Sequence, residues 1–270
     1  MNSPATPPSN AAAGPGGVVL HVEQWAAWAP GLAAQDDWRT WLQSPQPLPA
    51  DAPAAPGLPE VPAMARRRID PLGRAALQVA YWVQQDLGAE AVAAMPLVFA
   101  SRWGELARSV AMLQELARGE ALSPTAFSHS VHNAIGAQYS IQRGITANVS
   151  AVAAAEVSAA AGWVEAQALL ATGAPAVLLT VFDAPLPPLY AATGLDAPLA
   201  PLHAFALRLR LARPGEAGVL LSRGAGPVVG APARIIPPNL QVLQWLLDPA
   251  AELRQADGAA HWHWRHVVAS

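Results

Sequence analysis

The feature that most constrains the fold is an alternation of short apolar runs with longer segments whose apolar residues recur every three or four positions. A continuous apolar run typical of a buried strand lies at 96–101, and further strands are predicted at 145–150, 176–182 and 205–211, with shorter ones at 17–22 and 218–221. Helical spacing occurs at 69–88, 105–118, 157–170 and 240–247. Because a run that is apolar throughout predicts a strand buried on both faces, the order predicts an α/β fold with helices covering both faces of a sheet.

Three segments depart from this alternation. Residues 1–17 are rich in Pro, Ser and Gly, and they predict a flexible arm because ordering them would bury little apolar surface. Trp25, Trp28 and Leu32 have helical spacing and predict a helix after the first strand. The proline-rich residues 44–62 predict a surface loop.

Composition excludes several chemistries. Cysteine is absent, and the 16 basic residues are all arginine, so disulfides, thiolate metal sites, a cysteine nucleophile, Schiff-base lysines and a phosphate-binding lysine are excluded. A net charge of −3, with Arg66-Arg67-Arg68 as the one basic run, argues against nucleic acid. No basic start of a signal peptide and no long apolar span is visible, which predicts a cytoplasmic protein without stable membrane insertion.

Residues 122–173 carry the most specific pattern. Its fixed points are Ser123-Pro124, Asn133, Gly144, an expected strand at 145–152, a helix from Val157, and Gly173 before a further apolar run. This stretch resembles the β-ketoacyl synthases of the thiolase superfamily, where a Ser-Pro precedes a helix ending in a buried Asn. In that family the next strand ends at a nucleophilic cysteine, on a sharp elbow that opens a long central helix. Counting forward from Asn133 and back from Gly173 places that cysteine position at Glu156.

The resemblance implies a thiolase-like half fold, with a mixed sheet between helix layers and only the N-terminal β-ketoacyl synthase domain. It implies this domain over 18–250, with 251–270 as a C-terminal extension of the same domain. Glutamate cannot form the acyl thioester that condensation requires. The stretch after residue 180 shows none of the histidine motifs that the family's second half supplies. The chain therefore resembles chain length factors, in the short form found in aryl polyene biosynthesis, where the nucleophile position commonly holds glutamine.

This resemblance implies a non-catalytic subunit that forms a heterodimer with an active β-ketoacyl synthase and shapes its acyl tunnel. It would set the length of a polyene, polyketide or fatty-acid-type chain carried by an acyl carrier protein, with no cofactor and no metal. The tunnel and interface positions carried over from the family, on one predicted helix face and at the elbow, are Phe127, Val131, Asn133, Ala134, Ile135, Gln138 and Glu156. Two alternatives stay open: a stand-alone acyl hydrolase or malonyl decarboxylase using Glu156, and a scaffold that only stabilises the partner.

Each candidate also has a structural interpretation. Glu156 precedes a helix and is equally well explained as an acid that caps its N-terminus. Phe127, Val131 and Ala134, each taken alone, fit ordinary core packing. His129 and His132 are three residues apart, which would suit a metal only with a third ligand that the sequence does not identify.

The residues near the end of the chain, and two other candidates, also have both a structural and a functional interpretation. Alternation at 261–266 predicts a strand with Trp262 and Trp264 on one face and His261, His263 and His266 on the other. The cluster indicates strand pairing or docking of the terminus, and not a zinc site. Arg66-Arg67-Arg68 could contact an acidic acyl carrier protein, but a solvated turn is the preferred interpretation. Ser158 lacks the Gly-x-Ser-x-Gly flanks of a hydrolase elbow.

Overall fold

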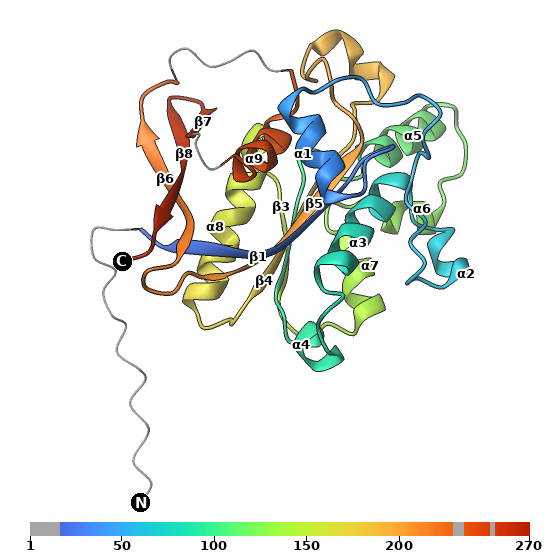
Figure 1. The fold of residues 1–270 in the computed structure, drawn as a ribbon. Coiled ribbons are helices and arrows are strands. Elements are labelled where there is room, and N and C mark those ends of the chain that lie inside the picture. Colours follow the sequence, from blue (N-terminus) through green and yellow to red (C-terminus); the bar gives the residue numbers. More distant parts are fainter. Residues whose placement is uncertain (1–16, 229–234, 249–251) are drawn as a thin grey trace, which may run out of the picture.

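The computed structural model describes residues 17–228, 235–248 and 252–270 (Figure 1). The helices and strands are β1 (Val19–Trp28), α1 (Gln35–Gln43), α2 (Ala63–Arg66), α3 (Pro71–Val83), α4 (Ala89–Ala93), β2 (Leu97–Ala100), α5 (Leu106–Ala117), α6 (Pro124–Ser128), α7 (Ala134–Arg143), β3 (Val149–Val152), α8 (Ser158–Ala171), β4 (Val177–Asp183), β5 (His203–Leu211), β6 (Ala217–Ala225), α9 (Pro238–Leu246), β7 (Leu253–Asp257) and β8 (Ala260–Val268). Two 3-10 turns, η1 (Ala155–Val157) and η2 (Pro188–Thr193), complete this order. Apart from Gly17, the arm expected at 1–17 lies outside the described residues.

In the described ranges, eight strands form one sheet in the order β3-β2-β4-β5-β1-β6-β8-β7. Strands β2, β3 and β4 are parallel, and β5 is antiparallel to both of its neighbours, β4 and β1. The sheet is therefore mixed, as the resemblance implied. Beyond β1 the sheet continues through β6, β8 and β7, of which β6 joins β1 at only two register positions.

Helices cover both faces of the sheet, as the alternation predicted. One apolar core lies between the sheet and α8 and α9, and the other lies beneath α3 and α7 (Figure 1). Helix α8 approaches the strands closely because its residues are small. A Cβ atom added at Gly162 would lie 2.8 Å from Leu179 Cδ1 and 3.0 Å from Ala100 Cβ. Any larger residue at this position would therefore push the helix off the sheet.

Strand β1 corrects the prediction for the first 35 residues. Trp25 and Trp28 belong to β1, which runs to Trp28, and Leu32 follows in a turn closed by a bridge to Ala29. The helical spacing of these residues was misleading because a strand that packs on both faces buries residues of either parity. The helix in this region is α1, whose buried side chains Trp38 and Leu42 lie four positions apart.

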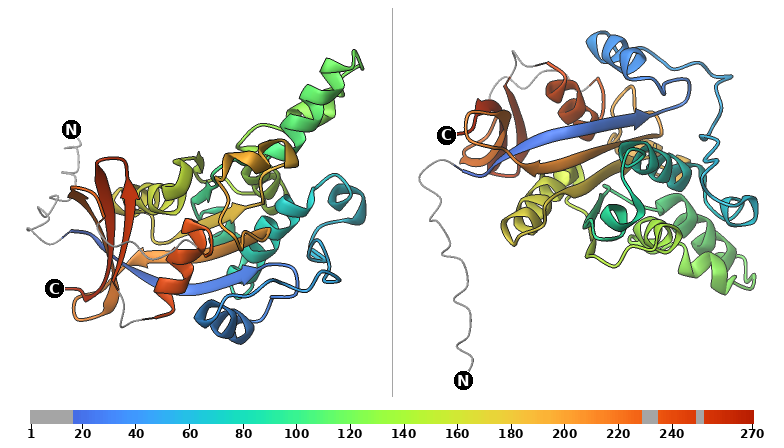
Figure 2. Two further views of the ribbon diagram at one scale, coloured as in Figure 1. Left: turned by 90° about the horizontal axis from the view of Figure 1, so that it is seen from above. Right: turned by 60° about the horizontal axis from the view of Figure 1, so that its bottom comes forward.

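The region expected to form one helix with Phe127 and Gln138 on a common face is also corrected. It contains two helices, α6 and α7, separated by a turn. Ser123 caps α6 by accepting a hydrogen bond from the Ala126 N–H at 3.3 Å. Figure 2 shows α5 and α6, in green, projecting from the body of the molecule. A continuous helical face across 127–138 therefore does not exist.

The remaining elements follow the expected order, with small differences. Residues 44–62 contain neither helix nor strand, although Leu58 and Val61 within them are buried. Asp70 occupies the N-cap position of α3 without a side-chain capping bond. The end of the chain forms strand β8, with Trp262 and Trp264 both packed on the core of α8 and α9. Strand β3 is shorter than predicted.

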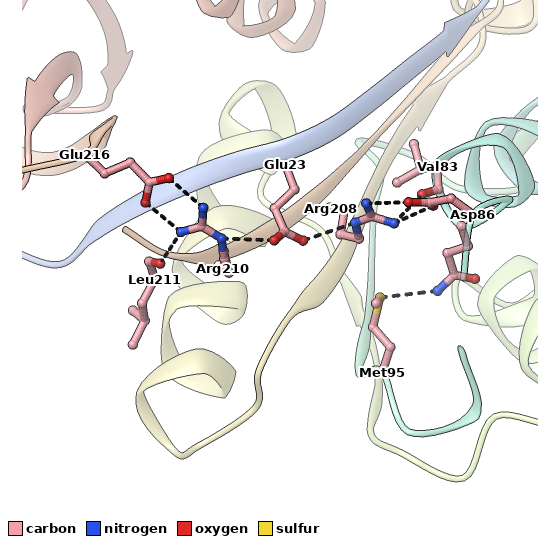
Figure 3. Close-up of polar contacts among 9 residues, drawn as sticks. Glu23, Val83, Asp86, Met95, Arg208, Arg210, Leu211 and Glu216 are labelled. Carbon is pink, nitrogen blue, oxygen red and sulfur yellow. Dashed lines mark hydrogen bonds and ion pairs between the residues drawn. The ribbon is translucent and has the colours of Figure 1, made fainter. Parts of the chain in front are cut away.

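Charged side chains form a ladder at the end of the sheet where β4 begins (Figure 3). Its members alternate in sign as Glu216, Arg210, Glu23, Arg208 and Asp86. Arg210 binds both oxygens of Glu216, at 2.6 and 2.7 Å, and donates to Glu23 at 2.9 Å. Arg208 likewise contacts both oxygens of Asp86, at 2.7 and 3.0 Å. The ladder thus links the β5–β6 turn to the residues after α3.

Candidate functional site at the elbow before helix α8

A sharp turn joins the parallel strand β3 to helix α8. Within it Ala155 has a φ of +46°, in the region that only glycine adopts without strain. Such a residue costs about 1–3 kcal/mol, which the surrounding contacts must offset. Ser158 supplies two of them, since its Oγ accepts from the Ala154 N–H at 3.0 Å and donates to the Ala155 carbonyl at 2.7 Å. Glu156 is half-buried directly after the strained residue.

The elbow lies where the sequence places it, between a parallel strand and a buried Ala-rich helix. Six of the first nine residues of α8, together with Val157, are buried. Ser158 has a structural role, because both of its hydrogen bonds close the turn that contains Ala155. Glu156 therefore occupies the first turn leading into a buried helix, where a carboxylate is favoured by the helix dipole.

A buried carboxylate lies at the end of the neighbouring strand β4. Asp183 is 5% exposed, and its Oδ1 accepts hydrogen bonds from the Ser101 hydroxyl at 3.0 Å and the Arg102 N–H at 2.8 Å. Ser101 Oγ accepts in turn from the Gly104 N–H at 2.8 Å. Strands β2 and β4 are parallel neighbours, so both contributing segments meet at the carboxyl edge of the sheet.

A second buried side chain connects this carboxylate to helix α8. Asn239, at the start of α9, donates from Nδ2 to Asp183 Oδ2 at 2.6 Å. Its Oδ1 accepts from the Ala159 N–H at 3.1 Å. Since Ala159 lies in the first turn of α8, the amide satisfies one of the N–H groups that a helix leaves unpaired at its start.

Burial shifts the pKa values of two neighbouring groups in opposite senses. Desolvation raises the pKa of Asp183, although His203 and the donors around it act the other way. Desolvation also lowers the pKa of His203, so this ring is neutral near pH 7. His203 pairs in register with Asp183, and its Nδ1 contacts the Pro201 carbonyl at 2.8 Å. Its Nε2 is buried without a hydrogen-bond partner in the described ranges.

The structure divides the predicted tunnel residues into two groups. Ala134 and Ile135 are both buried at the start of α7, and Ile135 belongs to the apolar core beneath α3. Phe127 and Val131 are exposed, at 62% and 43%, on the projecting part of the chain. Asn133, expected to be buried at a helix end, is exposed at the N-cap position of α7.

The remaining candidates have local partners. Gln138 Nε2 contacts His129 Nδ1 at 2.7 Å, while His132 Nε2 contacts the Ser101 carbonyl at 3.1 Å, so these two histidines do not share one site. Among the described residues no cluster of three or more His, Asp or Glu side chains could hold a metal. His266 lies on the same side of β8 as the tryptophans and stacks on Trp245, with centroids 4.2 Å apart, against the prediction that the histidines occupy the other face.

An apolar surface surrounds the free edge of the sheet. Strand β3 is an edge strand, and Val149 on it is 39% exposed. Exposed side chains near that edge and on the projecting helices also include Leu113, Leu116, Leu122, Phe127, Val131, Ile141 and Val164. An unpaired edge beside exposed apolar side chains is typical of a surface that another chain covers.

The sequence pattern did not single out the Asp183–Asn239 pair. Asp183 ends a run that is otherwise apolar except for Thr180, and Asn239 directly follows Pro237-Pro238 at the start of a helix. A charged residue at the carboxyl end of a buried strand was a usable signal, because ligands and buried polar groups collect there in α/β sheets. The partner on α9 had no signal, since 56 residues separate it from Asp183.

Comparison with known proteins agrees with this geometry. Residues 38–265 match the family model for the beta-ketoacyl synthase, N-terminal domain. No curated protein sequence matches the chain significantly. No helix in the described ranges is long and apolar enough to span a bilayer.

Three solved structures illustrate the similarity. A chain of the complex of the ketosynthase ApeO with its chain length factor ApeC, from Xenorhabdus doucetiae, superposes with a TM-score of 0.77 and 26% identity, over 92% of this chain and 99% of that chain. The ishigamide ketosynthase/chain length factor gives 0.61 at 15% identity, over 77% and 67%. A beta-ketoacyl synthase from Burkholderia phymatum STM815 gives 0.59 at 12% identity, over 79% and 65%. At 15% and 12% identity, the second and third structures show only that the fold is shared.

The family match covers most of the chain, and the mixed sheet, the elbow and the central helix are all in place. The chain belongs to the β-ketoacyl synthase family, in which it corresponds to the N-terminal domain.

Proposed function

We propose that this chain is a non-catalytic chain length factor, which pairs with an active β-ketoacyl synthase and shapes the acyl tunnel of that partner. The observation that carries the proposal is the residue at the elbow. Glu156 stands between β3 and α8, where the resemblance expects a cysteine, and the chain contains no cysteine at all. A carboxylate held there cannot hold an acyl group as a thioester, so condensation would require the partner's nucleophile.

The length of the matched chains supports the same proposal. The chain matched in the ketosynthase–chain length factor complex is covered over 99% of its length, so it is as short as this one. The ketosynthase from module 6 of the bacillaene synthase is covered over only 43%. This chain therefore corresponds in extent to a half-length partner found in a pair, and to about half of a longer ketosynthase.

The apolar surface around β3 is the face that we assign to the partner. A second chain could continue the sheet at the β3 edge, where main-chain groups on one side have no strand beside them. The exposed side chains of Phe127 and Val131 on the projecting helices would then become buried. Interfaces of stable pairs are enriched in such apolar and aromatic side chains.

The tunnel would be built from both chains. Phe127 and Val131 could reach the partner's acyl chain because they are exposed, whereas Ala134 and Ile135 lie inside this chain and would define the wall behind them. The acyl carrier protein would be engaged through the assembled pair. We assign no cofactor and no metal to this chain.

Co-expression with a candidate ketosynthase tests the proposal. We expect a heterodimer by native mass spectrometry and product only when both chains are present. Replacing Phe127 by Ala should lengthen the product or weaken the pair, with little effect on the melting temperature because the side chain is 62% exposed. Leu189→Ala is the matched control, since Leu189 is 68% exposed on η2, which is distant from β3 in sequence.

Two results would contradict the proposal. Turnover of an acyl or malonyl substrate by the purified chain, lost in Glu156→Gln, would make it a stand-alone enzyme. A pair whose product length is the same for the parent, Phe127→Ala and Ala134→Phe would leave only a stabilising scaffold.

A further inference from the structure

The buried Asp183–Asn239 pair connects a negative charge to the first turn of α8. Asp183 uses Oδ1 for two donors and Oδ2 for the Asn239 amide at 2.6 Å. Both residues are almost fully buried, at 5% and 1% exposure. Neither residue is needed to close the elbow turn itself, because Ser158 does that with its own hydroxyl.

The direction of the Asn239 amide follows from its two partners. Its NH2 group must face the carboxylate, which can only accept, and its carbonyl oxygen must face the Ala159 N–H, which can only donate. A reversed amide would place donor against donor at Ala159 and acceptor against acceptor at Asp183. The carboxylate therefore fixes the orientation of the group that caps the helix.

The charge of Asp183 has little direct compensation. In the described ranges no arginine forms an ion pair with it. Arg102 contributes its backbone N–H and places its guanidinium 3.7 Å from Asp196. His203 on β5 lowers the pKa of Asp183, although burial lowers the pKa of the His203 ring itself. Strand β7, which also contacts η1, carries the oppositely charged Arg254 and Asp257.

We propose that Asp183 and Asn239 are positioning residues of the elbow, which hold the first turn of α8 against β4 and place a negative charge behind it. A helix start attracts anions through its unpaired N–H groups and its dipole. Here one of these N–H groups is already bound by an amide that is backed by a carboxylate. The helix start is therefore less able to stabilise an ionised nucleophile at position 156. This inference rests on the same elbow as the proposed function, and it adds a second reason for the lack of catalysis.

A single introduced thiol measures this effect. Because the chain has no cysteine, E156C carries one thiol, and the pH dependence of its alkylation rate reports the electrostatics of the elbow. In E156C with Asp183→Asn the negative charge is lost, so we expect the alkylation midpoint to fall by roughly half to one pH unit. That variant should also have a lower melting temperature, because the amide NH2 groups at positions 183 and 239 now face each other.

Exchanging the two residues separates charge from hydrogen bonding. In E156C with Asp183→Asn and Asn239→Asp, Asn at 183 can accept from Ser101 and Arg102 and donate to Asp at 239, which also accepts from the Ala159 N–H. We expect the melting temperature to recover most of the loss. The charge now contacts the helix start directly, so the alkylation midpoint should rise above that of E156C by roughly half to one pH unit.

Glu216→Gln in the E156C background is the matched control, since it removes one carboxylate at the opposite end of the sheet and should leave the midpoint unchanged. If the three folded elbow variants share one midpoint, or if the exchanged pair melts no higher than the single Asp183→Asn variant, the inference is wrong. The measurement uses this chain alone, so such a failure would leave the proposed pairing with a ketosynthase untouched.

Discussion

The two ends of the sheet hold acidic residues in opposite electrostatic situations. At the end where β4 begins, Arg210 lowers the pKa of Glu216 to about 2, and Arg208 lowers the pKa of Asp86. At the carboxyl end of β2 and β4, desolvation raises the pKa of Asp183 and raises the pKa of Glu105 to about 7. In the described ranges, the two carboxylates whose pKa is raised both lie beyond the carboxyl ends of β2 and β4, where the effect of burial exceeds that of the neighbouring donors and charges.

The largest effect should come from the buried carboxylate of Asp183. In Asp183→Ala the Ser101 hydroxyl, the Arg102 N–H and the Asn239 amide all lose their acceptor inside the protein. A buried donor without a partner costs about 1–3 kcal/mol, so we expect a loss of about 3 kcal/mol or more in the free energy of unfolding. Urea denaturation measures it. A loss below about 1 kcal/mol would mean that water replaces the carboxylate.

Substitution of Glu105 should have an intermediate effect on stability, and the direction of its pH dependence follows from the raised pKa. Its pKa is about 7 in the folded chain, because of burial and the neighbouring Asp70, whereas an unfolded glutamate has an ordinary value near 4.3. The folded state therefore binds the extra proton, and this contribution to stability is present below the unfolded pKa and lost as the pH rises through about 7.

Glu105→Gln mimics the protonated form. We expect this variant to exceed the parent in stability by about 1–3 kcal/mol at pH 8 and to match it near pH 4. Thermal unfolding at both pH values checks this. An equal difference at the two pH values would show that packing, and not protonation, separates the two proteins.

Substitution in the charged ladder should have the smallest effect on stability, and its pH dependence should be opposite to that of Glu105. Arg210 holds the pKa of Glu216 at about 2 in the folded chain. The stability that the Glu216 carboxylate contributes is therefore present above the unfolded pKa and is lost as the pH falls towards 2. Glu216→Gln should therefore lower the melting temperature slightly at pH 7 and change it little near pH 2. Salt should reduce the effect at pH 7, since the ladder is accessible to solvent. If Glu216→Gln has the same melting temperature as the parent at pH 7, at low and at high salt, the ladder contributes nothing to stability.

The elements that the sequence predicted well share one property. The runs at β2 and β4 are apolar except for Thr180 and the terminal Asp183, and their strands are buried at every position. The resemblance at 122–173 predicted a sharp turn between a strand and the central helix, and the structure has a strained turn there, at Ala155. Local pattern sufficed in these places because burial on both faces and a short connection leave few alternatives.

Prediction failed where distant contacts decide the structure. Helical spacing at Trp25 and Trp28 gave way to strand β1, which pairs with β5 some 180 residues later and so gains more from the sheet than from a local helix. The break between α6 and α7 exposes Phe127 and Val131, which a continuous helix would have placed beside Ile135.

By itself, the sequence determined the α/β class and the absence of a thiol from the whole chain, because these depend on residue identity and on local apolar patterns. Only the tertiary structure decided that Asp183 and Asn239 meet at the first turn of α8. It also decided that carboxyl pKa values are raised at one end of the sheet and lowered at the other. A pKa depends on burial and on the nearest donors, which here come from segments separated by 56 residues or more.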